Sequence, residues 1–338
     1  MTTFHSSSEK AIKAIILLQS HIRGLLTRSQ LSNNPFYIGT FLPYIDPDLP
    51  YTFASNSLIT EDEIKYLLRA FQPLNDNVPV ICLKTIEYSN GCQYYGEWNQ
   101  VNNQKHGRGI LKWPDCPTYY GQFRMDKANG KGRLVFRQGE EYEGDWCDNK
   151  ANGLGLYKNK DVKYEGKWKD DRQDGIGTET WTDGTCYTGE FKNGQKTGTG
   201  KFRYVDGSTY SGTFLNNKLH GKGLYIWADK REYKGEWKYN KIEGEGVFKW
   251  PDGRKYIGHY KNDKKDGYGI FEWPDGKKYK GYWKNGKQQG EGEFYNPKDR
   301  TWQKGRWKNG KQESFTNMST TNSNSKENSQ QFINIIKA

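Results

Sequence analysis

A repeat of about 23 residues is the feature of this sequence that most constrains its fold. The five-residue core Tyr-x-Gly-x-aromatic begins at nine tyrosines that are spaced by 25, 23, 22, 23, 23, 23, 23 and 23 residues. A Gly-x-Gly pair begins 11 residues after eight of these tyrosines, and 13 residues after Tyr94. A tenth, degenerate copy at Gln303–Trp307 has lost its tyrosine. Such a period indicates a repeat architecture, in which each unit packs mainly against its neighbours.

Each copy predicts a β-hairpin. Side chains alternate between the two faces of a strand, so Tyr233, Gly235 and Trp237 are expected on one face. The same alternation predicts that Gly244 and Gly246 of the next strand share a face. Glycine weakens a strand, and its regular recurrence therefore predicts a close approach, in which the rings of one hairpin lie over the bare backbone of its neighbour.

Two kinds of turn complete the repeat. Asn193-Gly194 is typical of a tight turn within a hairpin, and the Pro-Asp-Gly run at 251–253 is typical of a turn between hairpins. Two strands and two turns account for the 23 residues, and no long crossover is needed. A closed all-β barrel or sandwich is the alternative architecture, which the regular period and the short connections disfavour.

This pattern closely resembles the MORN repeat family (membrane occupation and recognition nexus). The resemblance implies an all-β fold, namely an elongated single-layer antiparallel meander of hairpins, with α-helices at the N-terminus. The residues that match the repeat core are Tyr94, Gly96, Trp98, Tyr119, Gly121, Phe123, Tyr142, Gly144, Trp146, Tyr164, Gly166, Trp168, Tyr187, Gly189, Phe191, Tyr210, Gly212, Phe214, Tyr233, Gly235, Trp237, Tyr256, Gly258, Tyr260, Tyr279, Gly281 and Trp283.

The composition suits a thin sheet. Hydrophobic residues make up only 33% of the chain while aromatic residues reach 15%, so a layer of stacked rings is expected in place of a thick aliphatic core. No apolar run approaches the 18 or so residues that span a bilayer. The five cysteines are scattered and lack Cys-x-x-Cys spacing, which fits a reducing cytoplasm.

The N-terminal segment carries a second motif. Residues 6–31 have a helical pattern, and within it lie residues that match the IQ motif family at every defined position: Leu18, Gln19, Arg23, Gly24, Arg28 and Leu31. The resemblance implies that calmodulin or a related EF-hand light chain binds this helix. An apolar anchor would enter a methionine-lined groove while basic residues meet an acidic partner. A basic amphipathic helix packed on its own repeat array is the alternative.

Four regions are expected along the chain: an IQ-motif helix at 1–33, a linker with a capping helix at 34–90, the repeat array at 91–311, and a disordered polar tail at 312–338. The second helix is indicated by the capping box at Thr60 and Glu63 and ends before Pro73. We expect it to cover the edge of the first hairpin, because exposed sheet edges invite aggregation.

No catalytic chemistry is indicated, so we expect neither an enzyme nor a cofactor. The five histidines are scattered, and no set of residues has metal-ligand spacing. The Gly-x-Gly pairs lack the context of a nucleotide fingerprint. Lysines interleaved with aromatic residues could suggest single-stranded nucleic acid, but the repeat itself accounts for those rings, and no nucleic-acid partner is expected.

Positive charge gathers in the last repeats. Between Arg254 and Lys311 there are 16 Lys and Arg but only 7 Asp and Glu. Strand parity puts a basic stripe on the face opposite the rings, formed by Lys278, Lys280, Lys284, Lys304, Arg306 and Lys308. The stripe would meet an acidic partner, or would only keep the sheet soluble.

Two functions from different classes are consistent with these features. The first is a structural scaffold that bridges proteins in the cytoplasm, in the cytoskeleton or a cilium (axoneme), similar to the MORN proteins of protist cytoskeletons and ciliary radial spokes. The second is a peripheral membrane tether whose basic stripe binds anionic lipid such as a phosphoinositide.

Overall fold

The structure is a computed structural model that describes residues 59–114, 117–136 and 139–316. It contains the helix α2 (Glu61–Ala70) and twenty-one strands. The strands are β1 (Val80–Glu87), β2 (Gln93–Asn99), β3 (Lys105–Lys112), β4 (Thr118–Arg124), β5 (Lys127–Val135), β6 (Glu141–Cys147), β7 (Lys150–Lys158), β8 (Val162–Lys169), β9 (Arg172–Trp181), β10 (Cys186–Lys192), β11 (Gln195–Arg203), β12 (Thr209–Leu215), β13 (Lys218–Ile226), β14 (Glu232–Lys238), β15 (Lys241–Lys249), β16 (Lys255–Lys261), β17 (Lys264–Glu272), β18 (Lys278–Lys284), β19 (Lys287–Asn296), β20 (Thr301–Lys308) and β21 (Lys311–Thr316).

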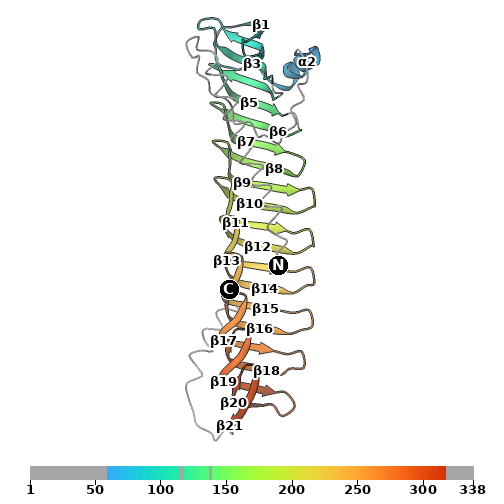
Figure 1. Cartoon of the computed structure of the whole chain (residues 1–338), viewed down its shortest axis with the longest axis vertical. Coiled ribbons are helices and arrows are strands. Elements are labelled where there is room, and N and C mark those ends of the chain that lie inside the picture. The colour runs from blue at the N-terminus through green and yellow to red at the C-terminus, as the bar shows by residue number, and fades with distance from the viewer. Residues whose placement is uncertain (1–58, 115–116, 137–138, 317–338) are drawn as a thin grey trace. The chain divides into compact units, whose positions relative to one another are not determined.

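All strands belong to one open antiparallel meander, in which each strand pairs with the strands before and after it in the chain (Figure 1). The predicted fold class is therefore confirmed. The chain divides into two compact units, which are described separately here. The first unit ends at Thr182 and also takes in Phe191–Gly194, and the second comprises Asp183–Glu190 and the residues from Gln195 onward.

The repeat tyrosine organises each hairpin. In the hairpin of β14 and β15, Gly235 pairs with Gly246, and the Tyr233 ring lies over both. The phenol Oη donates a hydrogen bond to the carbonyl of Glu236, three residues ahead on its own strand, at 3.1 Å. The eight other repeat tyrosines donate the same bond at 2.9–3.1 Å. All nine are at most 1% exposed, so each buried hydroxyl is satisfied inside its own repeat.

The third aromatic position links consecutive repeats. The Trp237 ring packs edge-on against Tyr233 of its own strand, at 5.4 Å between centroids, and against Tyr210 of the preceding repeat at 5.7 Å. The prediction that rings reach a neighbour's glycines holds for tryptophans such as Trp146, whose indole donates to the Gly132 carbonyl of the preceding repeat at 3.0 Å, but not for the tyrosines. Each tyrosine covers the glycines of its own hairpin, and the aromatic residue of the next repeat covers the tyrosine.

A β-bulge changes the facing of one glycine in each repeat. One residue separates Gly235 from Trp237, but three separate their partners Gly246 and Ile242. Gly244 lies within this bulge at φ +62°, and a Cβ built on it would meet the Glu236 side chain on the opposite face from Tyr233. Gly244 and Gly246 therefore do not share a face, contrary to the simple alternation. The bulge makes glycine necessary there, because a positive φ strains other residues.

The hairpin turns connect each repeat to the previous one. Asn216 and Asn217 both have positive φ, of 48° and 64°, as a type I′ turn requires. The Asn217 side chain accepts a hydrogen bond from the Lys196 amide at 2.7 Å, and the Asn217 amide donates to the Lys196 carbonyl at 3.0 Å. Asn240 makes the same pair of bonds with Leu219, and we call this two-bond contact the Asx clasp.

The start of the array differs from the expectation. Helix α2 has the predicted capping box between Thr60 and Glu63, but it lies on the face of the sheet against β3 and not along its edge (Figure 1). The edge of β2 is instead paired with β1. Strand β1 lies in the region that was predicted to be linker and helix. At the other end, β21 extends the sheet to Thr316, five residues into the predicted tail.

Replacing Gly235 by valine should destabilise the array by about 3 kcal/mol, as expected for overpacking that cannot relax. A Cβ at Gly235 would lie 2.6 Å from the Cα of Gly246 and would also clash with the Tyr233 hydroxyl. Hydrogen exchange should show amides of the surrounding hairpins losing protection first, because repeats couple mainly to their neighbours. Lys234→Val, an exposed position on the same strand, is the matched control. Equal protection in both variants would contradict the account of ring and glycine packing.

Candidate functional site

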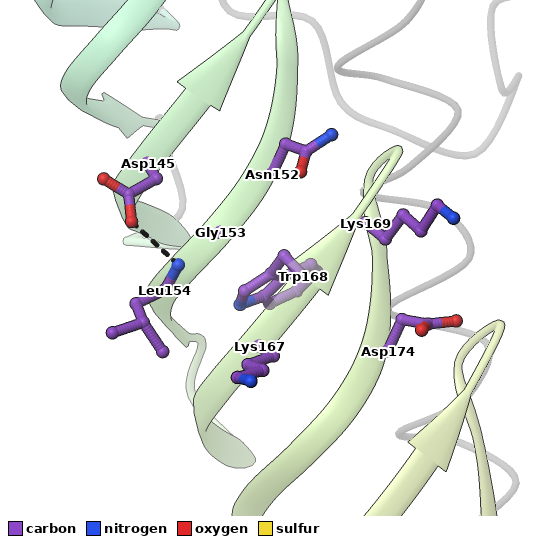
Figure 2. A pocket seen from close by; sticks show the side chains of 8 residues that line it. All are labelled: Asp145, Asn152, Gly153, Leu154, Lys167, Trp168, Lys169 and Asp174. Atoms are coloured by element: carbon purple, nitrogen blue, oxygen red, sulfur yellow. Dashed lines mark hydrogen bonds between the residues drawn. The ribbon is translucent and has the colours of Figure 1, made fainter.

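The best-formed hollow among the described residues is lined by carboxylates that support the sheet. This hollow of about 440 Å³ lies on β6–β9 within the first unit and is lined by Asp145, Asn152, Gly153, Leu154, Lys167, Trp168, Lys169 and Asp174 (Figure 2). The Asp145 carboxylate accepts a hydrogen bond from the Leu154 amide at 2.8 Å, and Asp174 contacts Lys192 Nζ at 3.2 Å. Both carboxylates therefore support the sheet. Within the described ranges, no group of three or more His, Cys, Asp and Glu side chains could hold a metal ion.

The face opposite the repeat tyrosines, here called the outer face, binds a helix in the first unit. Leu67 and Phe71 of α2 pack on Ile110 of β3, and the three are at most 5% exposed. Tyr95 of β2 and Tyr120 of β4 flank Ile110 in register and pack against the same cluster. An aromatic–aliphatic–aromatic row across three strands thus receives the apolar stripe of an amphipathic helix. We call this row the α2 seat.

Polar contacts fix the orientation of α2. The Glu63 carboxylate accepts a hydrogen bond from Tyr120 Oη at 2.8 Å and lies 3.4 Å from Lys112 Nζ. Burial opposes ionisation of Glu63, but hydrogen bonds from the Thr60 amide and Tyr120, together with the charge of Lys112, outweigh it and hold the pKa of Glu63 below its usual value. The acidic N-terminal turn of α2 is therefore bound by the Tyr120 hydroxyl and the Lys112 ammonium of the sheet.

The tyrosine-bearing face of the second unit carries a continuous ladder of rings. Neighbouring rings lie 4.3–6.1 Å apart, and the ladder consists of Phe202, Tyr204, Tyr225, Trp227, Phe248, Trp250, Phe271, Trp273 and Phe294. The five-residue core alone did not indicate this ladder. The sequence signal of the ladder is a pair of aromatic residues, separated by one residue, at the end of the second strand of a hairpin, as at Phe248 and Trp250.

A lysine is enclosed by the rings. Lys265 Nζ lies 4.3 Å from the centroid of Phe271 and 4.6 Å from that of Trp283, with Tyr256 and Trp250 at 5.1 and 5.3 Å. Burial, assisted by the nearby Arg254, lowers the pKa of Lys265 to about 8. Attraction of the ammonium to the ring faces offsets part of the desolvation. The sequence did not indicate this residue because its position varies between repeats: Leu219 and Ile242 occupy it in two of them, and Lys196, 5.2 Å from the Tyr187 ring, occupies it in a third.

The predicted basic stripe is on the outer face, but much of its charge is paired. Lys278 lies 3.0 Å from Glu272, Lys284 lies 3.3 Å from Asp266, and the Lys280 and Lys308 ammonium groups are 3.9 and 4.0 Å from Glu293 and Glu313. Arg306 is paired in register with Glu291. Such exposed pairs add little stability, but they reduce the net field of the stripe.

One sequence prediction falls on the N-terminal segment. The six IQ-motif residues, Leu18 to Leu31, lie outside the described residues, and the structure therefore leaves the light-chain site as a prediction. The helix that the structure describes, α2, is neither long nor apolar enough to cross a membrane.

Comparison with known proteins identifies the family. The MORN repeat matches residues 94–115, 119–141, 142–161, 164–186, 187–209, 210–230, 233–253, 256–278 and 279–299, which together cover more than half of the chain. The chain therefore belongs to the MORN repeat family, whose repeats are typical of non-enzymatic proteins that interact with proteins or membranes. All nine matches contain one of the buried tyrosines described above.

Individual relatives are similar only locally. Alsin of Rattus norvegicus and Alsin of Homo sapiens are each 36% identical to this chain over 69 residues, which is 19% of this chain and 4% of Alsin. The chain thus spans only a small fraction of the length of the curated relatives it matches. Among solved structures, the SAS-4 TCP domain of Drosophila melanogaster, in complex with a proline-rich motif of Ana2, is 14% identical with a TM-score of 0.29, covering 56% of this chain and 99% of that one.

The enclosed lysine predicts a pH dependence of stability. Between about pH 8 and its ordinary pKa of about 10.4, Lys265 holds a proton in the unfolded chain but not in the folded chain, so stability should rise with pH across this window. Lys265→Met should remove this rise and be more stable than the wild type at pH 7. Urea midpoints at pH 7.0 and 9.5 measure the effect, with the exposed Lys264→Met as control. An unchanged pH dependence in Lys265→Met would show that another group causes it.

Proposed function

We propose that this protein is a non-catalytic scaffold that bridges protein partners in a cytoskeletal or ciliary assembly. The observation that carries the proposal is the α2 seat, where the outer face of the array binds an amphipathic helix through an apolar row and a charged rim. The ring and glycine packing of the repeat lies on the opposite face, so the outer-face residues that follow the repeat tyrosine can vary without loss of that packing. An array of this kind offers many such surfaces in series.

The proposed scaffold carries a light chain on its N-terminal helix. Support comes from the sequence of Leu18 to Leu31, with its apolar anchor, its glutamine and its two spaced arginines. An IQ-type helix bound by calmodulin would connect the array to calcium signalling, and cytoplasmic partners would include calmodulin or a related EF-hand protein.

The light-chain proposal predicts tight binding of calmodulin by the full-length chain, measured by calorimetry with and without calcium. Gln19→Ala together with Arg23→Ala should weaken binding at least tenfold, because an amide and a cation that face the acidic partner are lost. Lys10→Ala together with Gln30→Ala removes the same two kinds of group at positions that the motif does not define, and this variant should bind normally. Equal affinities of the two double variants would contradict an IQ-type site.

A peripheral membrane tether is the second candidate, favoured by the excess of basic residues between Arg254 and Lys311. Each basic residue near an anionic bilayer contributes about 1 kcal/mol. The close carboxylates of Lys278, Lys280 and Lys284 reduce this attraction. We therefore favour a protein partner over lipid.

This preference predicts weak sedimentation with phosphoinositide-containing vesicles at physiological ionic strength. Changing Lys278, Lys280, Lys284, Lys304, Arg306 and Lys308 to Glu should alter vesicle binding little, and most of the protein should remain in the detergent-extracted cytoskeletal fraction. Strong vesicle binding that the six-fold variant loses, together with full detergent solubility, would favour the tether.

A further inference from the structure

We propose that the outer face of β15–β17 is a second helix-docking site, which takes an amphipathic helix with an acidic N-terminal turn from a partner protein. The inference deepens the proposed scaffold function, since it names one surface and the class of partner that fits it. The surface is a row of three aliphatic residues, Val247, Ile257 and Ile270, here called the aliphatic row. Val247 pairs with Ile257, and Ile257 pairs with Ile270, across adjacent strands.

The aliphatic row occupies the same register as the α2 seat. Ile110, Val247 and Ile270 each follow directly after the second glycine of a Gly-x-Gly pair, and Tyr120 and Ile257 each follow directly after a repeat tyrosine. Ile257 is 4% exposed, and Val247 and Ile270 are partly exposed on either side of it. In the first unit a helix covers these positions. Helix α2, the one helix in the described part of the chain, packs on β3.

The fold does not require aliphatic residues at these positions. The residue after the second glycine is Thr178 in β9, Lys201 in β11 and Glu293 in β19. Leu156, a single aliphatic residue at this position, is flanked by charged residues on both sides, Glu143 and Glu165. Three consecutive aliphatic residues on a face that elsewhere carries polar groups are typical of an interaction surface.

The rim of the row indicates the charge of the partner. Lys249 holds the register of Lys112, the lysine that contacts Glu63 of α2, and it pairs across the strands with Lys255. The Lys249 side chain is 59% exposed, and its ammonium forms only an exposed pair with Glu232 at 3.5 Å, which an acidic partner residue can share. Glu272, in the same line on β17, is already paired with Lys278 at 3.0 Å. Two adjacent lysines thus stand where the α2 seat binds an acidic turn.

The charge of the rim also argues against the chain's own N-terminal segment as the occupant. Residues 6–31 carry Lys10, Lys13, Arg23 and Arg28 against the single acidic residue Glu9. Like charges facing Lys249 and Lys255 would oppose docking. A helix with acidic residues in its first turn and apolar residues at i, i+3, i+4 and i+7 satisfies both the row and its rim.

The test uses the full-length chain and, as the probe, a fluorescent peptide with the sequence of residues 58–73, which contains the acidic turn and the apolar stripe of α2. Anisotropy should show saturable binding. Val247→Thr together with Ile270→Thr should weaken it at least tenfold, because the apolar seat is lost. Leu156→Thr, the same change at the same register in the first unit, should leave it unchanged. Thr178 shows that the fold accepts threonine at this position.

Exchanging the charges of Lys249 and the peptide's Glu63 distinguishes lost binding from lost folding, because a misfolded variant could not be rescued by a changed peptide. Lys249→Glu should weaken the wild-type peptide several-fold, and a peptide with Glu63→Lys should recover that loss on this variant alone. Absence of peptide binding, or binding unaffected by the changes in the row, would overturn the inference. Loss of anionic-vesicle binding in the Val247 and Ile270 double variant without peptide binding would also overturn it, in favour of a lipid surface. Calmodulin binding at Leu18–Leu31 would stand in either case, so the wider scaffold proposal is tested separately.

Discussion

The hydrogen bond from each repeat tyrosine to its own strand is the interaction on which the sheet depends. A phenol ring can lie flat over a strand pair only where both strands lack side chains, and this requirement accounts for paired glycines such as Gly235 and Gly246. The buried hydroxyl must also find an acceptor, and the carbonyl of Glu236 provides it within three residues. A local bond between near neighbours thus dictates glycine on two different strands. The next aromatic residue, Trp237, packs against Tyr233 and against Tyr210 of the preceding repeat, and so joins the two repeats.

The consequence for function is a division between the two faces. Rings, glycines and turns on the tyrosine-bearing face are fixed by packing. Burial in that layer lowers the pKa of Lys265. The outer-face position that follows each repeat tyrosine has no such requirement and changes from Tyr120 to Glu143, Lys234 or Ile257. Substitutions on the outer face can therefore change which partner binds while the ring packing stays the same. Helix α2 is the instance in which the structure describes both the surface and its occupant.

Much of this architecture followed from the sequence, because the repeat core records contacts made inside one hairpin. The nine tyrosines, their glycines, the Asn-Gly turns and the capping box of α2 are all local patterns. What was missed depends on contacts that leave no local pattern. Strands β1 and β21 lack the repeat core and are strands because they pair with β2 and β20. The bulge at Gly244 reverses the alternation for one residue, and a strict period of two cannot anticipate it.

The candidate surface was harder to predict than the fold. Ile110 and Tyr120 have the alternation of ordinary strand residues, and only the position of α2 identifies them as a seat. The basic stripe was predicted from parity, which could not indicate the carboxylates that pair with Lys278 and Lys284 from an adjacent strand. The motif from Leu18 to Leu31 remains a sequence-based prediction.

The Asx clasp constrains how such a gene can change length. Because Asn217 and Asn240 reach back to Lys196 and Leu219, 21 residues earlier in each case, a deletion inside a strand would misalign the clasp and every ring beyond it. Removal or duplication of one whole repeat brings the next clasp onto an equivalent backbone position. Unequal crossing-over between repeats should therefore yield viable proteins, whereas short frame-preserving deletions within strands should not. Copy number can then drift between lineages while the individual hairpin stays fixed, and outer-face surfaces can be gained or lost one repeat at a time.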